Sequence, residues 1–135
     1  MKRCIAVILV LAVVLSVSVS LAEFPPSEYE QKYIGSWSMY AVSRSGPIYF
    51  MVVTFLDNFT VIQRSMKFVD GELAIDNKAI GTWGEFSDSI LLTLAGTDMA
   101  ATINDDGYMV MKFFKTMETC GIYSKCPDMT SALGW

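Results

Sequence analysis

The sequence predicts an all-β protein, an antiparallel up-and-down meander barrel of about eight strands with one short N-terminal helix. From Ser36 onward, apolar residues either alternate with polar ones or form short runs of strand length. Turn residues separate these stretches at intervals of about 8–12 residues, which is typical of antiparallel barrels and sandwiches. After Tyr33, no stretch sustains the helical period of about 3.6 residues.

An internal repeat supports this architecture. Ile34-Gly35-Ser36-Trp37 recurs as Ile80-Gly81-Thr82-Trp83, and Thr54–Asp57 recurs at nearly the same offset as Thr102–Asp105. Each copy combines a Gly-x-Trp strand start with a further strand and an Asp-containing turn. The repeat is typical of a meander and carries little information about activity.

Residues 1–22 have the layout of a secretory signal peptide. Lys2 and Arg3 precede the apolar run Cys4–Leu15, and Ser20-Leu21-Ala22 provides small residues for cleavage after Ala22. The alternative is an uncleaved anchor, but this segment barely reaches the length of about 20 residues that spans a bilayer. We therefore expect a secreted protein, extracellular or in the periplasm or cell envelope, with no stable membrane anchor after cleavage.

The mature chain has the size of one domain and is acidic. Removal of Lys2 and Arg3 leaves eight basic residues against fourteen acidic ones, and the basic residues are scattered. Because an acidic surface repels phosphate backbones, we expect no nucleic-acid binding.

The elements follow in order along the chain. In the N-terminal segment 23–33, Ser27 and Glu30 have capping-box spacing and predict a helix over Ser27–Tyr33. The first strand alternates, with Trp37, Met39 and Ala41 on one face and Ser36, Ser38 and Tyr40 on the other. The continuously apolar run Ile48–Leu56 predicts a strand covered on both sides, with the helix outside.

Further turns delimit the remaining strands. Asp57-Asn58 and Asp70-Gly71 are hairpin turn signals on either side of a strand over Thr60–Val69. The later strands are predicted over Glu72–Asp76 and Ile80–Phe86, followed by three centred on Leu92, Ala101 and Met111. The barrel is expected to span 34–123, with 124–135 an irregular tail.

Gly35-x-Trp37 at the start of a meander resembles the lipocalin-like domains of secreted bacterial proteins, within the calycin group. In that group the tryptophan packs across the barrel floor, and the second copy, Gly81-x-Trp83, is similar to the small bacterial version. The likeness covers Ile34 to Lys115. The chain shows no match to the C-terminal arginine that covers this tryptophan in true lipocalins. The resemblance implies a binding or interaction module.

Cysteine and histidine usage constrains the chemistry. Cleavage leaves Cys120 and Cys126, and an even pair in an exported chain predicts a disulfide, the alternative being two free thiols in a reducing compartment. The chain has no histidine. We therefore expect no metal site, no cofactor, no Ser-His-Asp triad and no Cys-His pair.

The remaining enzymatic alternative is a pair of catalytic carboxylates, as in glycoside hydrolysis. However, the candidate aspartates fall in predicted turns, where hydrogen bonding to the nearby backbone explains them. They are Asp57, Asp70, Asp88, Asp105 and Asp106. The sequence therefore predicts a protein that is not an enzyme.

One charged residue falls on a predicted inward face. Arg64 shares a face with Ile62 and Met66, and Glu85 points inward if Trp83 does. Since a buried charge needs a partner, two interpretations stay open. Arg64 either pairs structurally with Glu85 near the barrel mouth or is exposed by a bulge; otherwise it anchors a ligand carboxylate through its bidentate guanidinium.

The predicted lumen is rich in methionine, which suits either a packed core or a pliable apolar cavity. Its candidate residues are Trp37, Met39, Ile62, Arg64, Trp83, Glu85, Met99, Met109, Met111 and Phe113.

We expect a secreted non-enzymatic binding module that holds a small apolar ligand or a protein partner at the barrel mouth. The alternative is an exported inhibitor, or a host- or envelope-facing interaction protein, with a solid core. A cavity above about 300 Å³ favours the first. A filled core with an exposed apolar patch favours the second.

Overall fold

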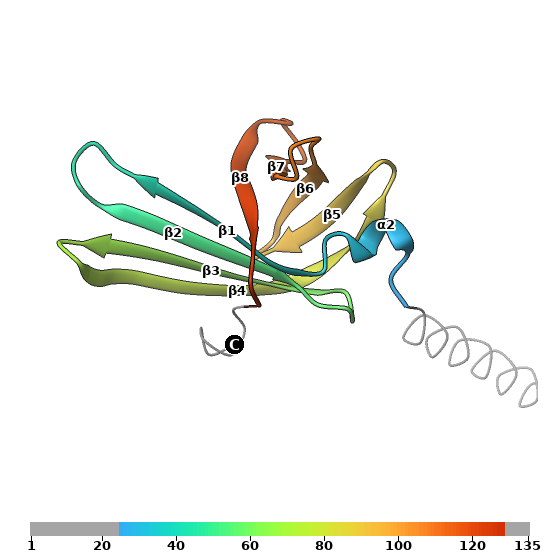
Figure 1. Cartoon of the computed structure of the whole chain (residues 1–135), viewed down its shortest axis with the longest axis horizontal. Helices are drawn as coiled ribbons and strands as arrows, with labels where there is room; N and C mark the ends of the chain where they lie inside the picture. Colours follow the sequence, from blue (N-terminus) through green and yellow to red (C-terminus); the bar gives the residue numbers. More distant parts are fainter. Residues whose placement is uncertain (1–24, 129–135) are drawn as a thin grey trace, which may run out of the picture.

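The computed structural model describes residues 25–128 and shows the predicted fold class. Eight antiparallel strands follow one another in sequence order, and β8 pairs back with β1 to close the barrel (Figure 1). The elements are α2 (Glu28–Gln31), β1 (Gly35–Val42), β2 (Ile48–Phe55), β3 (Thr60–Val69), β4 (Glu72–Phe86), β5 (Ser89–Leu94), β6 (Thr97–Ile103), β7 (Met109–Phe113) and β8 (Thr119–Cys126).

The short helix α2 forms through the predicted capping box but is shorter than predicted. The Glu30 amide donates to Ser27 Oγ at 3.1 Å, and the Ser27 amide donates to Glu30 Oε1 at 2.8 Å. The helix lies at one end of the barrel, not outside β2 as expected (Figure 1). There Glu30 Oε2 accepts a 3.0 Å hydrogen bond from the Glu85 amide, which ties α2 to β4.

Aromatic rings close the barrel at this end. Phe55 packs edge-on against both Tyr33 and Trp83, with ring centroids 6.2 and 5.2 Å apart. Each indole N–H finds a backbone carbonyl, Trp83 that of Leu56 at 3.0 Å and Trp37 that of Tyr33 at 2.9 Å. Both tryptophans are buried in the same core cluster.

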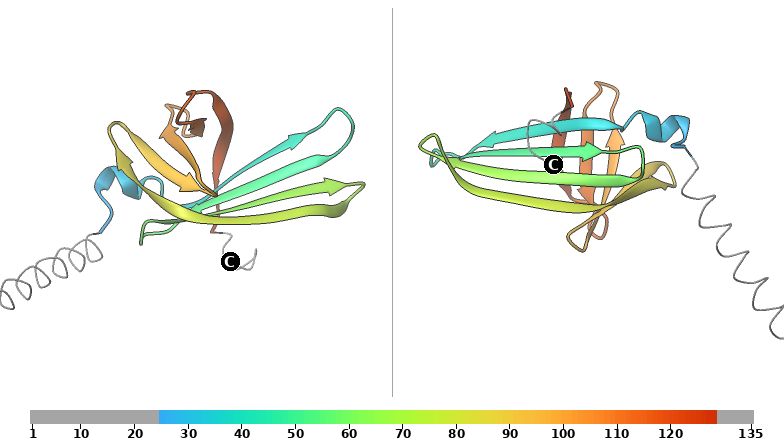
Figure 2. Two further views of the ribbon diagram at one scale, coloured as in Figure 1. Left: turned by 180° about the vertical axis from the view of Figure 1, so that it is seen from behind. Right: turned by 90° about the horizontal axis from the view of Figure 1, so that it is seen from below.

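At the other end, the first four strands extend past the barrel as an open sheet (Figures 1 and 2). β4 pairs with β5 only through Gly81–Phe86, and β1 pairs with β8 only through Ser36–Ser38. The parts of β1–β4 beyond these pairs, here called the blade, expose large apolar side chains to solvent. Among them are Tyr40, Val42, Ile48, Tyr49, Leu73, Ile75 and Ile80.

Two predicted strand boundaries are wrong. Asn77-Lys78, predicted to separate two strands, lies inside the single long strand β4, where the two residues pair with Ser65 and Arg64 of β3. The strand β8 over Thr119–Cys126 has no predicted counterpart, and its last residues 124–126 are not part of an irregular tail as predicted. In the turn between β2 and β3, the positive φ falls on Phe59 rather than on Asp57 or Asn58.

The predicted signal peptide over 1–22, the first residues of the N-terminal segment and positions 129–135 of the predicted tail lie outside the described residues. Within 25–128, no helix has the length and apolarity needed to cross a membrane.

Candidate functional site

The open end of the barrel, opposite α2, holds a pocket of about 320 Å³. Three of the predicted lumen residues line this mouth pocket: Met99, Met111 and Phe113. Its other walls come from Met51 of β2, Gln63 of β3, the turn between β5 and β6, and Cys120 and Tyr123 of β8. The pocket is therefore built from strands on both sides of the barrel.

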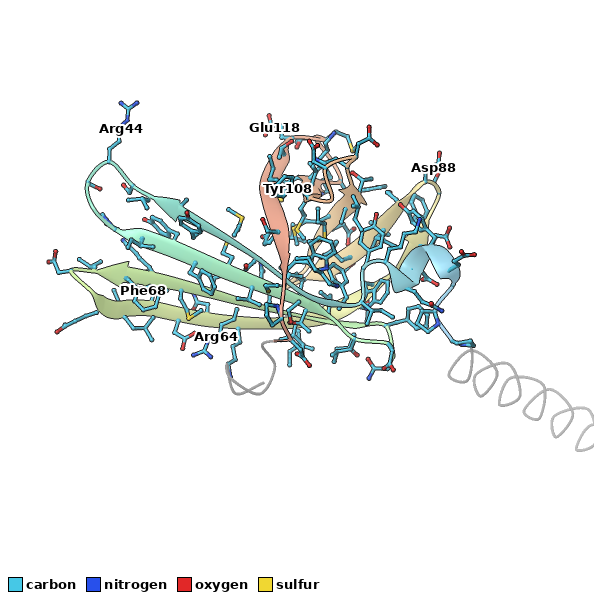
Figure 3. The ribbon with its side chains drawn as sticks, viewed as in Figure 1. Arg44, Arg64, Phe68, Asp88, Tyr108 and Glu118 are labelled. Atoms are coloured by element: carbon cyan, nitrogen blue, oxygen red, sulfur yellow. The ribbon has the colours of Figure 1, made fainter. Side chains whose placement is uncertain are left out.

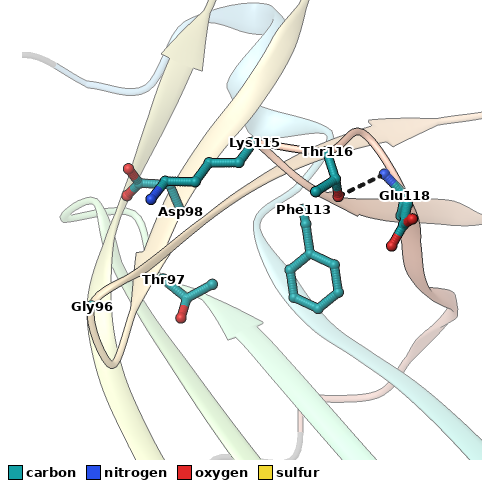
Figure 4. Close-up of a pocket in the computed structure, with 7 residues that line it drawn as sticks. All are labelled: Gly96, Thr97, Asp98, Phe113, Lys115, Thr116 and Glu118. Atoms are coloured by element: carbon teal, nitrogen blue, oxygen red, sulfur yellow. Dashed lines mark hydrogen bonds between the residues drawn. The ribbon is translucent and has the colours of Figure 1, made fainter.

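Two further hollows adjoin the mouth pocket. A cleft of about 400 Å³ shares Thr97 and Phe113 with it and lies between the β5–β6 and β7–β8 turns (Figure 4). A groove of about 210 Å³ shares Met51 with it and runs along the blade face that continues the barrel interior. Together they form a discontinuous trough from the turns across the mouth and onto the blade.

The cleft contains one aromatic side chain, Phe113, surrounded by polar and charged residues. Phe113 points into it, while Asp98, Lys115 and Glu118 stand at its border (Figure 4). The Glu118 amide donates to Thr116 Oγ1 at 3.3 Å, and the Phe114 amide donates to the Asp98 carbonyl at 3.1 Å. The second of these bonds holds the two turns against each other beside the mouth.

The base of the mouth pocket is apolar with two titratable groups. Burial raises the pKa of Tyr123 to about 12, with a smaller contribution from nearby Cys120, while a hydrogen bond with Gln63 acts in the opposite direction. Burial also raises the pKa of the Cys120 thiol. Cys120 Sγ donates to the Met111 carbonyl at 3.4 Å. At neutral pH both groups are therefore uncharged, which suits an apolar occupant.

The other predicted lumen residues do not line the mouth pocket. Trp37, Trp83 and Met109 belong to the packed core between the pocket and α2, and Met39 packs partly buried against that core. Ile62 lies on the opposite face of the sheet, where it pairs with Thr54 and Ile80.

The inward placement of Arg64 and its pairing with Glu85 are wrong. In β3 the inward face carries Val61 and Gln63, so Arg64 points away from the barrel (Figure 3). Its guanidinium forms a bidentate ion pair with Asp76 of β4, Nη2 to Oδ2 at 2.6 Å and Nε to Oδ1 at 2.8 Å. This hydrogen bonding lowers the pKa of the Asp76 carboxyl and raises that of Arg64. Arg64 is therefore not a lumen anchor.

Glu85 lies at the far end of the molecule from the mouth. Its side chain is exposed, and its Oε2 accepts a 3.1 Å hydrogen bond from Ser27 Oγ at the start of α2. It stabilises the attachment of the helix instead of facing a ligand.

The predicted Cys120–Cys126 disulfide does not form, and both cysteines are free. Five strand residues lie between them, and six steps of about 3.3 Å place their Cα atoms about 20 Å apart. A disulfide requires Cα atoms within about 7 Å of each other. The two also lie in different surroundings, since Cys120 packs against the core and Cys126 pairs with Ser36 at the strand end.

A basic residue does cover the first tryptophan. Lys125 of β8 places Nζ 4.8 Å from the centroid of the Trp37 ring and donates to the Ile34 carbonyl. Burial lowers the pKa of Lys125. Sequence reasoning misses this contact because the predicted barrel ends before residue 125.

Sequence reasoning also misses Met51, Gln63 and Tyr123 in the mouth pocket. Met51 lies in the continuously apolar run Ile48–Leu56, in which alternation does not show which residues face the barrel interior. Gln63 is hidden because the opposite face of β3 is the more apolar one.

Residues 25–128 contain no group of three or more cysteine and acidic side chains able to hold a metal ion. Comparison with protein-family models, with curated proteins and with solved structures found no match to this chain.

Proposed function

We propose that this protein is a secreted, non-enzymatic, lipocalin-like binding module that takes an apolar group into the mouth pocket. The observation that carries this proposal is the asymmetry of the barrel. One end is filled by aromatic rings and covered by α2, while the other opens into a pocket of about 320 Å³.

The size of the pocket limits its occupant. Ligand sites typically measure about 300–1,000 Å³, and this one lies at the small end. It suits a small apolar molecule or a single large apolar side chain of a protein partner better than a long-chain lipid. Methionine side chains adapt to differently shaped apolar partners, which favours a tolerant site.

The lipocalin-like part of the proposal rests on the Trp37 environment. The Gly-x-Trp motif begins β1, its indole is buried in the core, and the Lys125 ammonium lies over the ring. A lysine from the last strand thus occupies the place that the resemblance assigns to a C-terminal arginine.

A second candidate is an interaction protein that binds through the blade. Its exposed aromatic and aliphatic residues, led by Tyr40 at 74% and Ile80 at 71% exposure, favour this interpretation. Exposed apolar patches often mark protein interaction sites.

Fluorescence titration with N-phenyl-1-naphthylamine, an apolar probe of suitable size, tests the mouth pocket. We expect saturable binding that Met51→Lys weakens by about tenfold or more, or about 1.4 kcal/mol, because the change places a charge in an apolar pocket.

The matched control is Ile122→Lys, which introduces the same side chain at an exposed position on the barrel exterior. It should bind the probe as the wild type does. Equal probe affinity in Met51→Lys and wild type, or no saturable signal at all, would contradict the mouth-pocket proposal.

A further inference from the structure

The longest unpaired strand edge among the described residues belongs to the blade. β4 pairs with β3 from Glu72 to Thr82, but β5 joins its other side only from Gly81. Within residues 25–128, the stretch Glu72–Ile80 therefore has no strand neighbour on that side. A long edge of this kind presents backbone donors and acceptors ready to pair with another strand.

The side chains of this edge are exposed and partly apolar. Leu73, Ile75 and Ile80 are 48%, 46% and 71% exposed. Asp76 and Lys78 place opposite charges on either side of Asn77, on the face that points away from the barrel interior. The edge thus combines apolar surface with an Asp-Asn-Lys sequence. When a second copy runs antiparallel to it, the aspartate of each copy can face the lysine of the other.

We propose that two copies of this chain form a dimer by antiparallel pairing of their β4 edges about a two-fold axis at Asn77. A two-fold axis perpendicular to the sheet keeps the same face of both copies on the same side. Residues at equal distances before and after Asn77 then lie opposite each other, with their side chains on the same face. Asp76, which keeps its ion pair with Arg64 of its own copy, then lies opposite Lys78 of the second copy. Ile75 lies opposite Ala79 of the second copy. Every such pair occurs twice.

The charges select this register over its neighbours. If the axis moves by one residue to Asp76, the two Asp76 carboxylates face each other. If the axis moves to Lys78, the two Lys78 ammonium groups face each other. Like charges directly opposite each other in a sheet are destabilising, whereas opposite charges are favourable. Of these three registers, only the axis at Asn77 also matches the large Ile75 with a small alanine.

The dimer changes the groove on the blade. Ile75 and Asn77 form its outer border, next to Tyr49, Met51 and Lys67. Pairing at β4 places the grooves of the two copies side by side on one continuous sheet. The inference does not depend on the mouth pocket, because none of the edge residues Glu72–Ile80 lines that pocket.

Sedimentation velocity of the mature chain, residues 23–135, over a wide concentration range tests this assembly. The wild type should reach twice the monomer mass. Lys78→Glu should remain monomeric, because it places a second carboxylate opposite Asp76 of the other copy. Arg64 lies beside position 78 in β3 and is already bound to Asp76, so the new carboxylate would share this cation with Asp76 within the monomer.

The double variant Asp76→Lys/Lys78→Glu restores opposite charges across the axis and should recover the doubled mass. Lys67→Glu is the matched control, with the same change of charge on β3 away from the edge, and should dimerise like the wild type. Circular dichroism checks that each variant is folded. A wild type that stays monomeric, or a Lys78→Glu variant that still dimerises, would overturn the proposal.

Discussion

The phenol of Tyr123 lies in the barrel interior with 1% of its surface exposed. Its pKa is raised from 10.0 to about 12, chiefly because burial disfavours the phenolate. A raised pKa in the folded state means that ionisation opposes folding. The stability linked to this group is complete below pH 10 and is lost as the pH rises towards about 12.

We predict that Tyr123→Phe makes the free energy of unfolding less sensitive to pH in the alkaline range. One pKa unit corresponds to about 1.4 kcal/mol, so the effect of this single group is at most about 2–3 kcal/mol. Urea unfolding at a series of pH values from neutral to about 12 measures it.

Tyr40→Phe is the control, since this ring is 74% exposed. If Tyr123→Phe and the wild type lost stability in parallel above about pH 10, the buried phenol would not be the cause.

At the scale of elements, β4 shows where pattern and pairing differ. Asn77-Lys78 is a turn-like dipeptide, yet it continues the strand because β3 supplies a partner at each position. Predicting two strands in place of β4 and no strand in place of β8 are compensating errors in the strand count. The alternation of apolar and polar residues predicts that a strand is present, but the length of the strand depends on how far the neighbouring strand pairs with it.

Gly81 marks the point at which β4 joins β5. A Cβ at this position would come well inside 3.0 Å of the Thr93 carbonyl oxygen, a backbone atom that is not free to move away. The glycine of the second Gly-x-Trp motif is therefore needed for close approach of two strands.

We predict that Gly81→Ala destabilises the protein by about 1–3 kcal/mol, as overpacking does, measured by thermal or urea unfolding. Gly84→Ala, on the same strand, is the control because its nearest neighbour, Glu30 Oε2, is 3.9 Å away. It should leave stability within about 0.5 kcal/mol of the wild type. Equal losses from the two changes would show that strand propensity, not close approach, governs Gly81.

β3 explains why the site is only partly predictable. Its outward face carries Ile62, Met66 and Phe68 and is more apolar than its inward face with Gln63. Alternation shows which residues share a face, but the rule that the more apolar face lies inside fails here. It fails because the outward face of the blade is itself apolar.

At the scale of the whole molecule, closure depends on strand pairing and a packed core. The described cysteines are free and lie at separate places along β8. A short disulfide loop contributes roughly 2 kcal/mol in the chain-entropy estimate, and the pair Cys120 and Cys126 makes no such contribution.

We therefore predict that the midpoint of thermal unfolding is unchanged by a reducing agent and by Cys126→Ser. Differential scanning calorimetry with and without dithiothreitol measures this. A drop of several degrees on reduction, of the size expected for a loss of about 2 kcal/mol in a domain this small, would show that the cysteines stabilise the fold covalently.

Local sequence patterns are sufficient to specify the all-β class, the antiparallel meander, the capping box of α2 and the inward face of the first strand with Trp37. These features follow from alternation, turn chemistry and capping, each of which acts over a few neighbouring residues. The assembled barrel was needed to establish which face of β3 is inside, how far β4 runs, that Arg64 meets Asp76, and that Lys125 covers Trp37. Those outcomes depend on which strands become neighbours and over what length, and a linear pattern does not contain that information.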